Sequence, residues 1–285
     1  MRLGARAFGP DELVVMAVVN RTPDSFFDRG ATFALDAALA AVDRAVAEGA
    51  AIIDIGGVKA GPGDHVDATE ELRRTSDVVH AVRERHPDVV ISVDTWRSEV
   101  GRELVAAGAD LLNDTWGGPD PDLAVVAAET RVGLVCAHAG EQAPRTRPHR
   151  VTYDDVVADV VARTTAQAER AVALGVRPDG ILVDPAHDFG KNTRHSLAVT
   201  RRLGELAATG WPVLVALSNK DFLGETLDLP VEDRHEATLA ATAVSAWLGA
   251  RVFRAHDVRA TRRVLDVVAS VRGTREPAVA RRGLA

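Results

Sequence analysis

The length, composition and charge of the chain exclude several classes of protein. Its 285 residues are 46% hydrophobic and 26% charged, with 34 basic against 41 acidic residues and a net charge of −7. This balance excludes an intrinsically disordered chain and argues against a surface built broadly for nucleic acid or anionic membrane. The chain has one cysteine, no apolar run as long as a membrane span and no secretory segment at its start, so we expect a soluble, cytoplasmic protein.

One pattern recurs along the chain: an alanine-rich helix, a glycine, a short aliphatic strand and a polar cluster. The glycines lie where a helix ends in left-handed backbone. They are Gly49, Gly108, Gly175 and Gly249. In the first helix, Leu35, Leu39, Val42 and Val46 recur at helical spacing and predict one apolar face. The strand segments are continuous apolar runs, which are typical of parallel strands covered on both faces.

Continued along the chain, this pattern predicts eight strand–helix units. Strands are expected near residues 13–19, 51–55, 89–94, 110–113, 132–137, 180–184, 212–217 and 251–255, and the last helix over about 257–271. We therefore predict an α/β fold, a single (β/α)8 TIM barrel over about 12–272, in one domain of residues 1–285 with short flexible tails. A doubly wound open sheet is the alternative, but no G-x-G-x-x-G motif follows the first strand.

Almost every predicted strand ends in a polar or ionisable residue. In a TIM barrel, functional groups lie at these carboxyl ends, so together they indicate a binding site. A helix cap or a solvated side chain is as good an interpretation for any one of them, above all for Asp114 and Asp257. The strand ends carry Asn20, Asp54, Asp94, Asn113, Asp114, His138, Asp184, Lys220, Arg254, His256 and Asp257.

The chemistry of these side chains suits a flat heterocycle that carries a diphosphate. Carboxylate and amide groups can bond the N–H edge of a nitrogen-rich ring, and cationic donors suit phosphate oxygens. The ring candidates are Asp94, Asn113 and Asp184; the anion candidates are Lys220, Arg254 and His256; and Asn20 is the candidate metal ligand. The alternative for Arg254 and His256 is a surface pair at the start of the last helix.

Three segments after strands stand out by composition. Residues 20–30 and 56–64 are rich in glycine or proline and are expected to be mobile loops that act as lids. Residues 145–150 form a basic run, which is either a solvated loop or a lip that attracts an anionic substrate to the mouth of the barrel.

The strand-end motifs occur in a fixed order along nearly the whole chain. They are MAVVNRTPDSFFDRG at 16–30, DIGG at 54–57, SVDT at 92–95, ND at 113–114, DPAHDFGK at 184–191, SNK at 218–220 and RAHDV at 254–258. In this order they resemble the motifs of dihydropteroate synthase, the pterin-binding TIM-barrel enzyme of folate synthesis.

The resemblance implies a reaction and a set of roles. The family ejects pyrophosphate from a dihydropterin-methyl diphosphate, and 4-aminobenzoate attacks the resulting cation-like carbon. The implied pterin ligands are Asp94, Asn113, Asp184 and Lys220; the implied ligands of the diphosphate and its Mg²⁺ are Arg254, His256 and Asn20; and the implied catalytic residues are Lys220, Arg254 and His256. The resemblance also implies a homodimer that packs through late helices.

The departures from the family are concentrated in the loops. The family's G-G-E-S-T-R-P-G becomes GGVKAGPG, so Ala60 and Gly61 replace a threonine and an arginine. The family's S-R-K-S becomes SNKD, so Asn219 replaces an arginine, and Asp221 adds a carboxylate that opposes 4-aminobenzoate. Losing two arginines could cost on the order of 10⁴-fold in rate if the effects add.

Smaller departures accompany these. The family's D-P-G-x-G-F becomes DPAHDF at 184–189, and M-H-M becomes AHA at 137–139. Arg21 stands where the family has a small apolar residue, and Arg21 and Lys59 are candidates to swing toward a phosphate in place of the lost arginines.

Three functions therefore stay open. The first is a pterin-binding homologue in which condensation is weak or lost, and we favour it because the changes spare the ring-binding positions. The second is an active dihydropteroate synthase with reshaped loops. The third is a transferase on the same scaffold that uses another acceptor.

Overall fold

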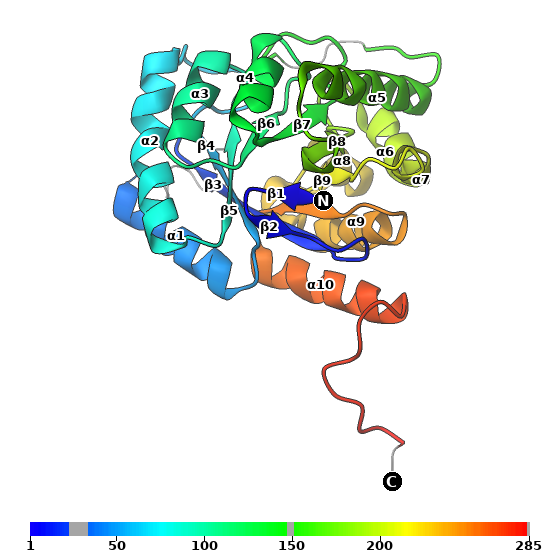
Figure 1. Cartoon of the computed structure of the whole chain (residues 1–285). Coiled ribbons are helices and arrows are strands. Elements are labelled where there is room, and N and C mark those ends of the chain that lie inside the picture. The colour runs from blue at the N-terminus through cyan, green and yellow to red at the C-terminus, as the bar shows by residue number, and fades with distance from the viewer. Residues whose placement is uncertain (23–33, 147–150, 284–285) are drawn as a thin grey trace.

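Eight parallel strands form the barrel of the computed structural model, which describes residues 1–22, 34–146 and 151–283 (Figure 1). The strands follow the order β8-β7-β6-β5-β4-β3-β10-β9. A parallel bridge between Val183 and Val213 brings the two edge strands together, and the Val183 N–H donates to Pro212 O at 3.0 Å. The predicted TIM barrel is confirmed.

Beyond a short antiparallel hairpin, each described barrel strand is followed by one or two helices. The strands are β1 (Arg2–Leu3), β2 (Arg6–Ala7), β3 (Val14–Asn20), β4 (Ile52–Gly56), β5 (Val90–Asp94), β6 (Leu111–Asp114), β7 (Gly133–Ala137), β8 (Ile181–Asp184), β9 (Leu214–Ala216) and β10 (Val252–Ala255). The helices are α1 (Leu35–Ala47), α2 (Ala68–Arg85), α3 (Ser98–Ala106), α4 (Asp122–Thr130), α5 (Val156–Leu174), α6 (Thr193–Arg201), α7 (Leu203–Ala207), α8 (Asp221–Leu227), α9 (His235–Trp247) and α10 (Val258–Val271).

The predicted strand boundaries agree with the structure to within two residues. The largest difference is at β9, which begins after Pro212, a residue with no N–H to donate to a ladder. The four predicted glycine caps are confirmed, since their φ angles lie between 101° and 117°. The predicted face of α1 is confirmed as well: Val42 is completely buried, and its three partners pack partly buried against the core.

Two apolar clusters hold the barrel together. One lies between the strands and the surrounding helices. The other takes inward-facing residues from each barrel strand, such as Met16 and Ile52, and includes Leu3 and Phe8 from the N-terminal hairpin. The hairpin thus covers the amino end of the barrel (Figure 1), which leaves the carboxyl ends of the strands for a site.

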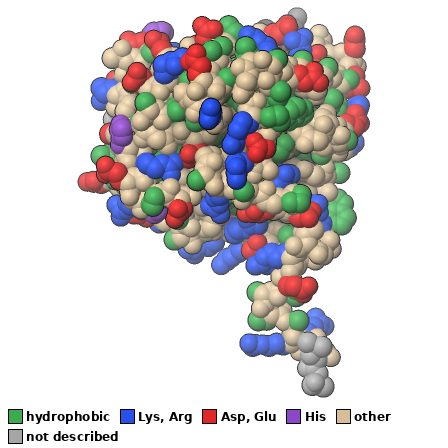
Figure 2. Space-filling model, viewed as in Figure 1, with side chains coloured by type: hydrophobic (Ala, Val, Ile, Leu, Met, Phe, Trp, Pro, Cys, Tyr) green, Lys and Arg blue, Asp and Glu red, His purple; other side chains and the backbone are tan. Residues whose placement is uncertain are grey.

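The surface shows no separation of charge on the face that Figure 2 presents, where acidic and basic side chains are interspersed. Within the described part of the chain, no helix is both long and apolar enough to cross a membrane. Of the two loops predicted to be lids, residues 56–64 are described, whereas most of the first lies within 23–33, outside the described residues.

Candidate functional site

The interior of the barrel changes from apolar to polar toward the carboxyl ends of the strands. Strand pairing places Asp54 of β4 beside Ser92 of β5, and Asp94 beside Asn113 of β6. Asp54 Oδ1 accepts hydrogen bonds from the Ser92 hydroxyl at 2.6 Å and from Asn113 Nδ2 at 3.2 Å. These three side chains are completely buried, so the bonds among them satisfy polar groups that water cannot reach.

Arg254 of β10 joins two acidic side chains of this layer. Its Nε donates to Asp54 Oδ2 at 2.6 Å, and its Nη2 donates to Asp94 Oδ2 at 3.0 Å. Burial raises the pKa of Asp94 to about 7, with a further contribution from the charge of Asp54, although Arg254 opposes the rise. Near neutral pH the Asp94 carboxyl can therefore either donate or accept a hydrogen bond with a ligand.

Asn113 and Asp184 offer buried acceptors to a ligand. Asn113 Oδ1 has no hydrogen-bond partner among the described residues. Asp184 Oδ1 accepts the Ala186 N–H at 2.7 Å, and burial raises the pKa of Asp184 to about 6. Because an unpaired buried acceptor is costly, a ligand N–H that reaches Asn113 gains more than the same bond at a solvated surface.

Lys220 borders the site together with two aromatic rings. Its Nζ donates to His187 O at 2.8 Å and lies 4.5 Å from the centroid of the Phe189 ring. Phe189 in turn meets Trp116 edge to face, at a centroid distance of 4.9 Å. Burial lowers the pKa of Lys220. The loops after β6, β8 and β9 therefore supply one cation and two apolar rings to the same border.

Asn20 and His256 complete the predicted set. Gly56 separates Asn20 from Asp94 in the strand register, and a methyl group placed on Gly56 would lie 3.9 Å from Asn20 Oδ1 and 3.5 Å from Asp94 Cβ. His256 lines a cavity of about 170 Å³ beyond β10, where its main-chain N–H donates to the Ser218 hydroxyl at 3.3 Å. The structure thus brings Asn20 to Asp94 and places His256 in a neighbouring recess.

Arg21 is bound to a helix, which differs from the prediction that it swings toward a phosphate. It is 5% exposed, and its guanidinium donates to Arg74 O at 2.8 Å and to Asp77 at 3.2 Å on α2. Since a guanidinium so placed would lose buried bonds by moving, Arg21 is no substitute for a missing loop arginine.

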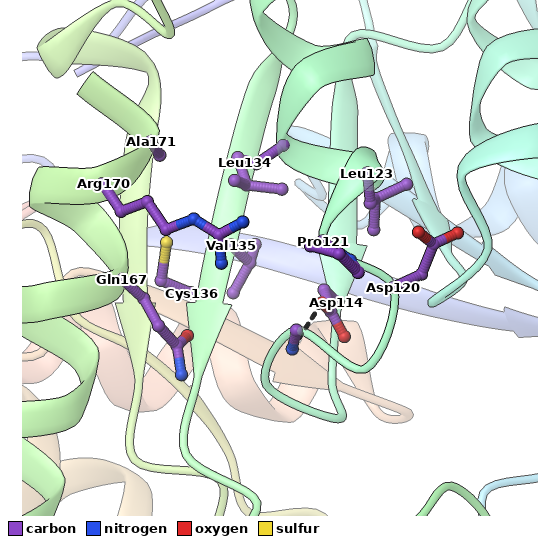
Figure 3. A pocket seen from close by; sticks show the side chains of 12 residues that line it. Asp114, Asp120, Pro121, Leu123, Leu134, Val135, Cys136, Gln167, Arg170 and Ala171 are labelled. Carbon is purple, nitrogen blue, oxygen red and sulfur yellow. Dashed lines mark hydrogen bonds between the residues drawn. The ribbon is translucent and has the colours of Figure 1, made fainter. Parts of the chain in front are cut away.

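Asp114 folds the loop after β6 and does not cap a helix, so that prediction is wrong. Its two carboxylate oxygens accept the N–H of Trp116 at 3.1 Å and of Gly118 at 2.8 Å, whereas α4 begins further along the chain. The side chain borders a pocket of about 50 Å³ that opens between β6, β7, α4 and α5, outside the barrel (Figure 3). The predicted cap Asp257 is confirmed, since it accepts the Ala260 N–H at 2.9 Å.

A buried lysine that joins two loops was not among the predicted site residues. Lys191 Nζ lies 2.8 Å from His138 Nδ1 and donates to the carbonyl groups of His138, Ala186 and Phe189. His138 Nε2 lies 2.7 Å from Asp159 on α5. Burial lowers the pKa of Lys191 to about 7. Its place at the end of the DPAHDFGK motif was the available signal.

Comparison with known proteins identifies the family. Residues 16–256 match the model of the family described as pterin binding enzyme. The chain belongs to this family. It is 58% identical, over 99% of both chains, to a protein of Mycobacterium leprae named inactive dihydropteroate synthase 2.

Solved structures agree with this assignment. A dihydropteroate synthase of Yersinia pestis, in complex with a sulfonamide drug, superposes with a TM-score of 0.90 at 34% identity, covering 96% of this chain and 99% of that one. The dihydropteroate synthase of Xanthomonas albilineans in complex with 7,8-dihydropteroate gives a TM-score of 0.82 at 35% identity, covering 97% and 98%. This chain is a dihydropteroate synthase homologue.

The pterin-binding family has glycines in its D-P-G-x-G-F motif, and here two other residues keep a glycine-like backbone. The φ angles are 46° at Ala186 and 68° at Asp188, in the left-handed region that costs most L-residues roughly 1–2 kcal/mol. Asp188 has contacts that offset this cost, because its carboxylate accepts from the Ser196 hydroxyl at 3.2 Å and from the Phe222 N–H at 3.4 Å. Nothing in the structure explains the alanine.

Proposed function

We propose that this chain binds a dihydropterin diphosphate but condenses it with 4-aminobenzoate weakly or not at all. The observation that carries the proposal is a difference between the ring-binding side chains and the loops at the mouth of the barrel. Asn113 and Asp184 are buried and Asp94 is partly buried, all at the carboxyl ends of barrel strands, whereas the loops around them lack the side chains that the family uses for chemistry. The name of the Mycobacterium leprae relative supports the second half, and the ligand of the Xanthomonas structure supports the first.

The pterin ring would lie against the polar layer. Asn113 Oδ1 and the Asp184 carboxylate would accept N–H groups of the ring, and Asp94 would share a proton with it because its pKa lies near 7. Phe189 and Lys220 would cover one side, with the ammonium group directed by His187 O. These groups orient the ring and exclude water from it.

The diphosphate would lie toward β3 and β10. Arg254 and His256 would donate to its oxygens, although Arg254 also pairs with two carboxylates, Asp54 and Asp94. The described residues include no cluster of three histidine, cysteine or acidic side chains for a metal. Asn20 Oδ1 is close to the Asp94 side chain across Gly56, and this fits a Mg²⁺ ion held mainly by water and phosphate oxygens. Bound there, Mg²⁺ would stabilise the negative charge of the diphosphate.

The acceptor side of the mouth explains why condensation would fail. Arg234 Nη1 donates to Asn219 O and to Asp221 Oδ1, both at 2.9 Å, so this guanidinium is bound by the protein itself. The Asp221 side chain stays 77% exposed beside Lys220 and repels a carboxylate such as that of 4-aminobenzoate. In the second loop, Ala60 and Gly61 supply no group to hold a departing anion.

We further propose a cytoplasmic homodimer. The single cysteine is typical of a reducing compartment. Helices α9 and α10 pack against each other and leave large apolar side chains exposed, a composition that suits an interface with a second copy. These side chains are Val244, Trp247, Val267 and Val271.

The deciding experiment measures binding and turnover separately. Calorimetry with dihydropterin-methyl diphosphate and Mg²⁺ should show binding that Asp184→Ala abolishes. The steady-state assay with 4-aminobenzoate should give turnover far below the roughly 1 s⁻¹ of ordinary enzymes. Turnover in that range would restore the active synthase. If the chain binds the pterin diphosphate and condenses it with another amine but not with 4-aminobenzoate, the result would support the transferase. No binding at all would overturn the proposal.

A further inference from the structure

Arg145 connects two loops that are far apart in the sequence. It lies after β7, at the start of the basic run, and its guanidinium reaches the second loop, residues 57–66 after β4. Its Nε donates to Gly61 O at 3.4 Å, and its Nη1 donates to Asp64 O at 2.5 Å. Both acceptors are main-chain carbonyls in the middle of that loop.

The order of the strands shows where this contact lies. Between β4 and β7 the barrel contains β5 and β6, whose carboxyl ends carry Asp94 and Asn113. A contact between the loops after β4 and β7 therefore spans the mouth above those two side chains. The contact does not extend over β9 and β10, the side of the mouth that carries Lys220 and Arg254.

The ends of the second loop are held separately. Arg74 of α2 donates to Gly57 O at 3.1 Å, and Arg97 after β5 donates to Val66 O at 2.7 Å. Both arginines lie next to the loop in the barrel. Arg145 differs because it reaches the middle of the loop from the far side of the mouth.

The composition of the second loop gives an external contact many conformations to restrict. Residues 57–66 hold three glycines and a proline and form neither helix nor strand, so the backbone of this loop has many accessible conformations. Two charge-assisted hydrogen bonds to one guanidinium fix two of its peptide groups at once.

The charge of Arg145 is also unusual. Among the residues that the structure describes, no carboxylate pairs with Arg145. The neighbouring cation Lys59 lies close by, since a Cβ placed on Gly61 would be 3.9 Å from Lys59 Cε. Both positive side chains therefore approach Gly61, which has no side chain of its own.

We propose that Arg145 is a positioning residue that holds the second loop across the Asp94–Asn113 side of the mouth. In the free protein the contact restrains the loop, and a ligand in the pocket leaves only after the contact breaks. The effect on a pterin ligand depends on the proposed function, but the restraint of the free loop does not.

The first test uses hydrogen exchange in the free, full-length protein. Arg145→Ala should speed amide exchange in residues 57–66 about tenfold and leave the barrel strands unchanged, and Arg145→Lys, which cannot form both bonds in the same geometry, should fall between the two. Arg102→Ala is the matched control, because it removes an exposed arginine that pairs with Glu129 away from this loop. Unchanged exchange in Arg145→Ala would overturn the proposal.

The second test uses stopped-flow release of a dihydropterin-methyl diphosphate. Arg145→Ala should release it several-fold faster, whereas Arg102→Ala should release it at the rate of the unmodified chain. Equal release rates, with binding intact, would overturn the role in retention. If the unmodified chain binds no pterin, the proposed function fails, while the exchange experiment still decides whether Arg145 restrains the loop.

Discussion

Arg254 donates a hydrogen bond from Nε to Asp54 Oδ2 at 2.6 Å, and this bond joins β10 to β4 across the intervening strand β3. Asp54 is completely buried, and it also accepts hydrogen bonds from Ser92 and Asn113. One carboxylate therefore orients a cation and an amide of the proposed site without facing the ligand itself. The site depends on a polar layer that lies beneath it.

Asp54→Ala should lower the free energy of unfolding by about 3 kcal/mol, because it removes the buried acceptor of Ser92, Asn113 and Arg254 Nε and leaves Arg254 only its bond to Asp94. Urea denaturation at pH 7 measures this change. The control is Glu129→Ala, which breaks the exposed pair with Arg102 at 2.7 Å and should cost less than about 1 kcal/mol. Equal losses in the two variants would show that Arg254 finds other partners.

The buried Asp184 should make stability depend on pH in a defined direction. Its folded pKa, about 6, lies above its ordinary value of 3.8 because of burial. Between these pH values the folded state holds more protons than the unfolded state. The stability that Asp184 contributes to the fold is therefore fully present below pH 4 and is lost as the pH rises through 6.

Asp184→Asn tests this sign. Asparagine keeps an oxygen for the Ala186 N–H but never ionises, so the variant should be more stable than the unmodified chain by on the order of 2–3 kcal/mol at pH 7. The difference should vanish near pH 4. Urea denaturation at the two pH values measures it, and a variant that is less stable at pH 7 would contradict the direction of the shift. The same variant should bind the pterin more weakly, because it loses the charge.

Ala186→Gly should stabilise the protein. The alanine has a φ of 46°, and glycine would remove the strain of this left-handed backbone, about 1–2 kcal/mol. This gain exceeds the entropic cost of the more flexible unfolded chain, about 0.5–1 kcal/mol. We expect a gain near 0.5 kcal/mol by chemical denaturation. Ala208→Gly, at a helix end with a φ of −67°, is the control and should destabilise.

Sequence patterns predict the local features of this fold and miss its long-range contacts. The strands follow from apolar runs that end in polar residues, and Gly49 and Gly108 mark helix ends because only left-handed backbone closes them. The contact of Arg254 with Asp54 depends on the stagger of β10 against β4, and that of Arg145 with Gly61 depends on two loops meeting across the mouth. No local sequence pattern around these residues predicts either contact, and Asp54 was noted only as one strand end among many.

The altered second loop yields the last prediction. Ala60→Thr combined with Gly61→Arg should raise turnover with 4-aminobenzoate at least tenfold, since a group that contacts the departing anion can be worth roughly 3 kcal/mol. The loop can accept the change sterically: Gly61 does not have a positive φ, and a Cβ there would meet only Lys59 Cε, at 3.9 Å.

Two further variants accompany this experiment: Asp221→Ser alone, and Asp221→Ser combined with the loop change. Asp221 is exposed and pairs with Arg234, so its removal should act on the KM for 4-aminobenzoate, whereas the loop change should act on kcat. A gain from Asp221→Ser with none from the loop would place the lost activity in acceptor binding. No gain from either change or their combination would mean that the path of the loop, held by Arg145, excludes the acceptor whatever side chains it carries.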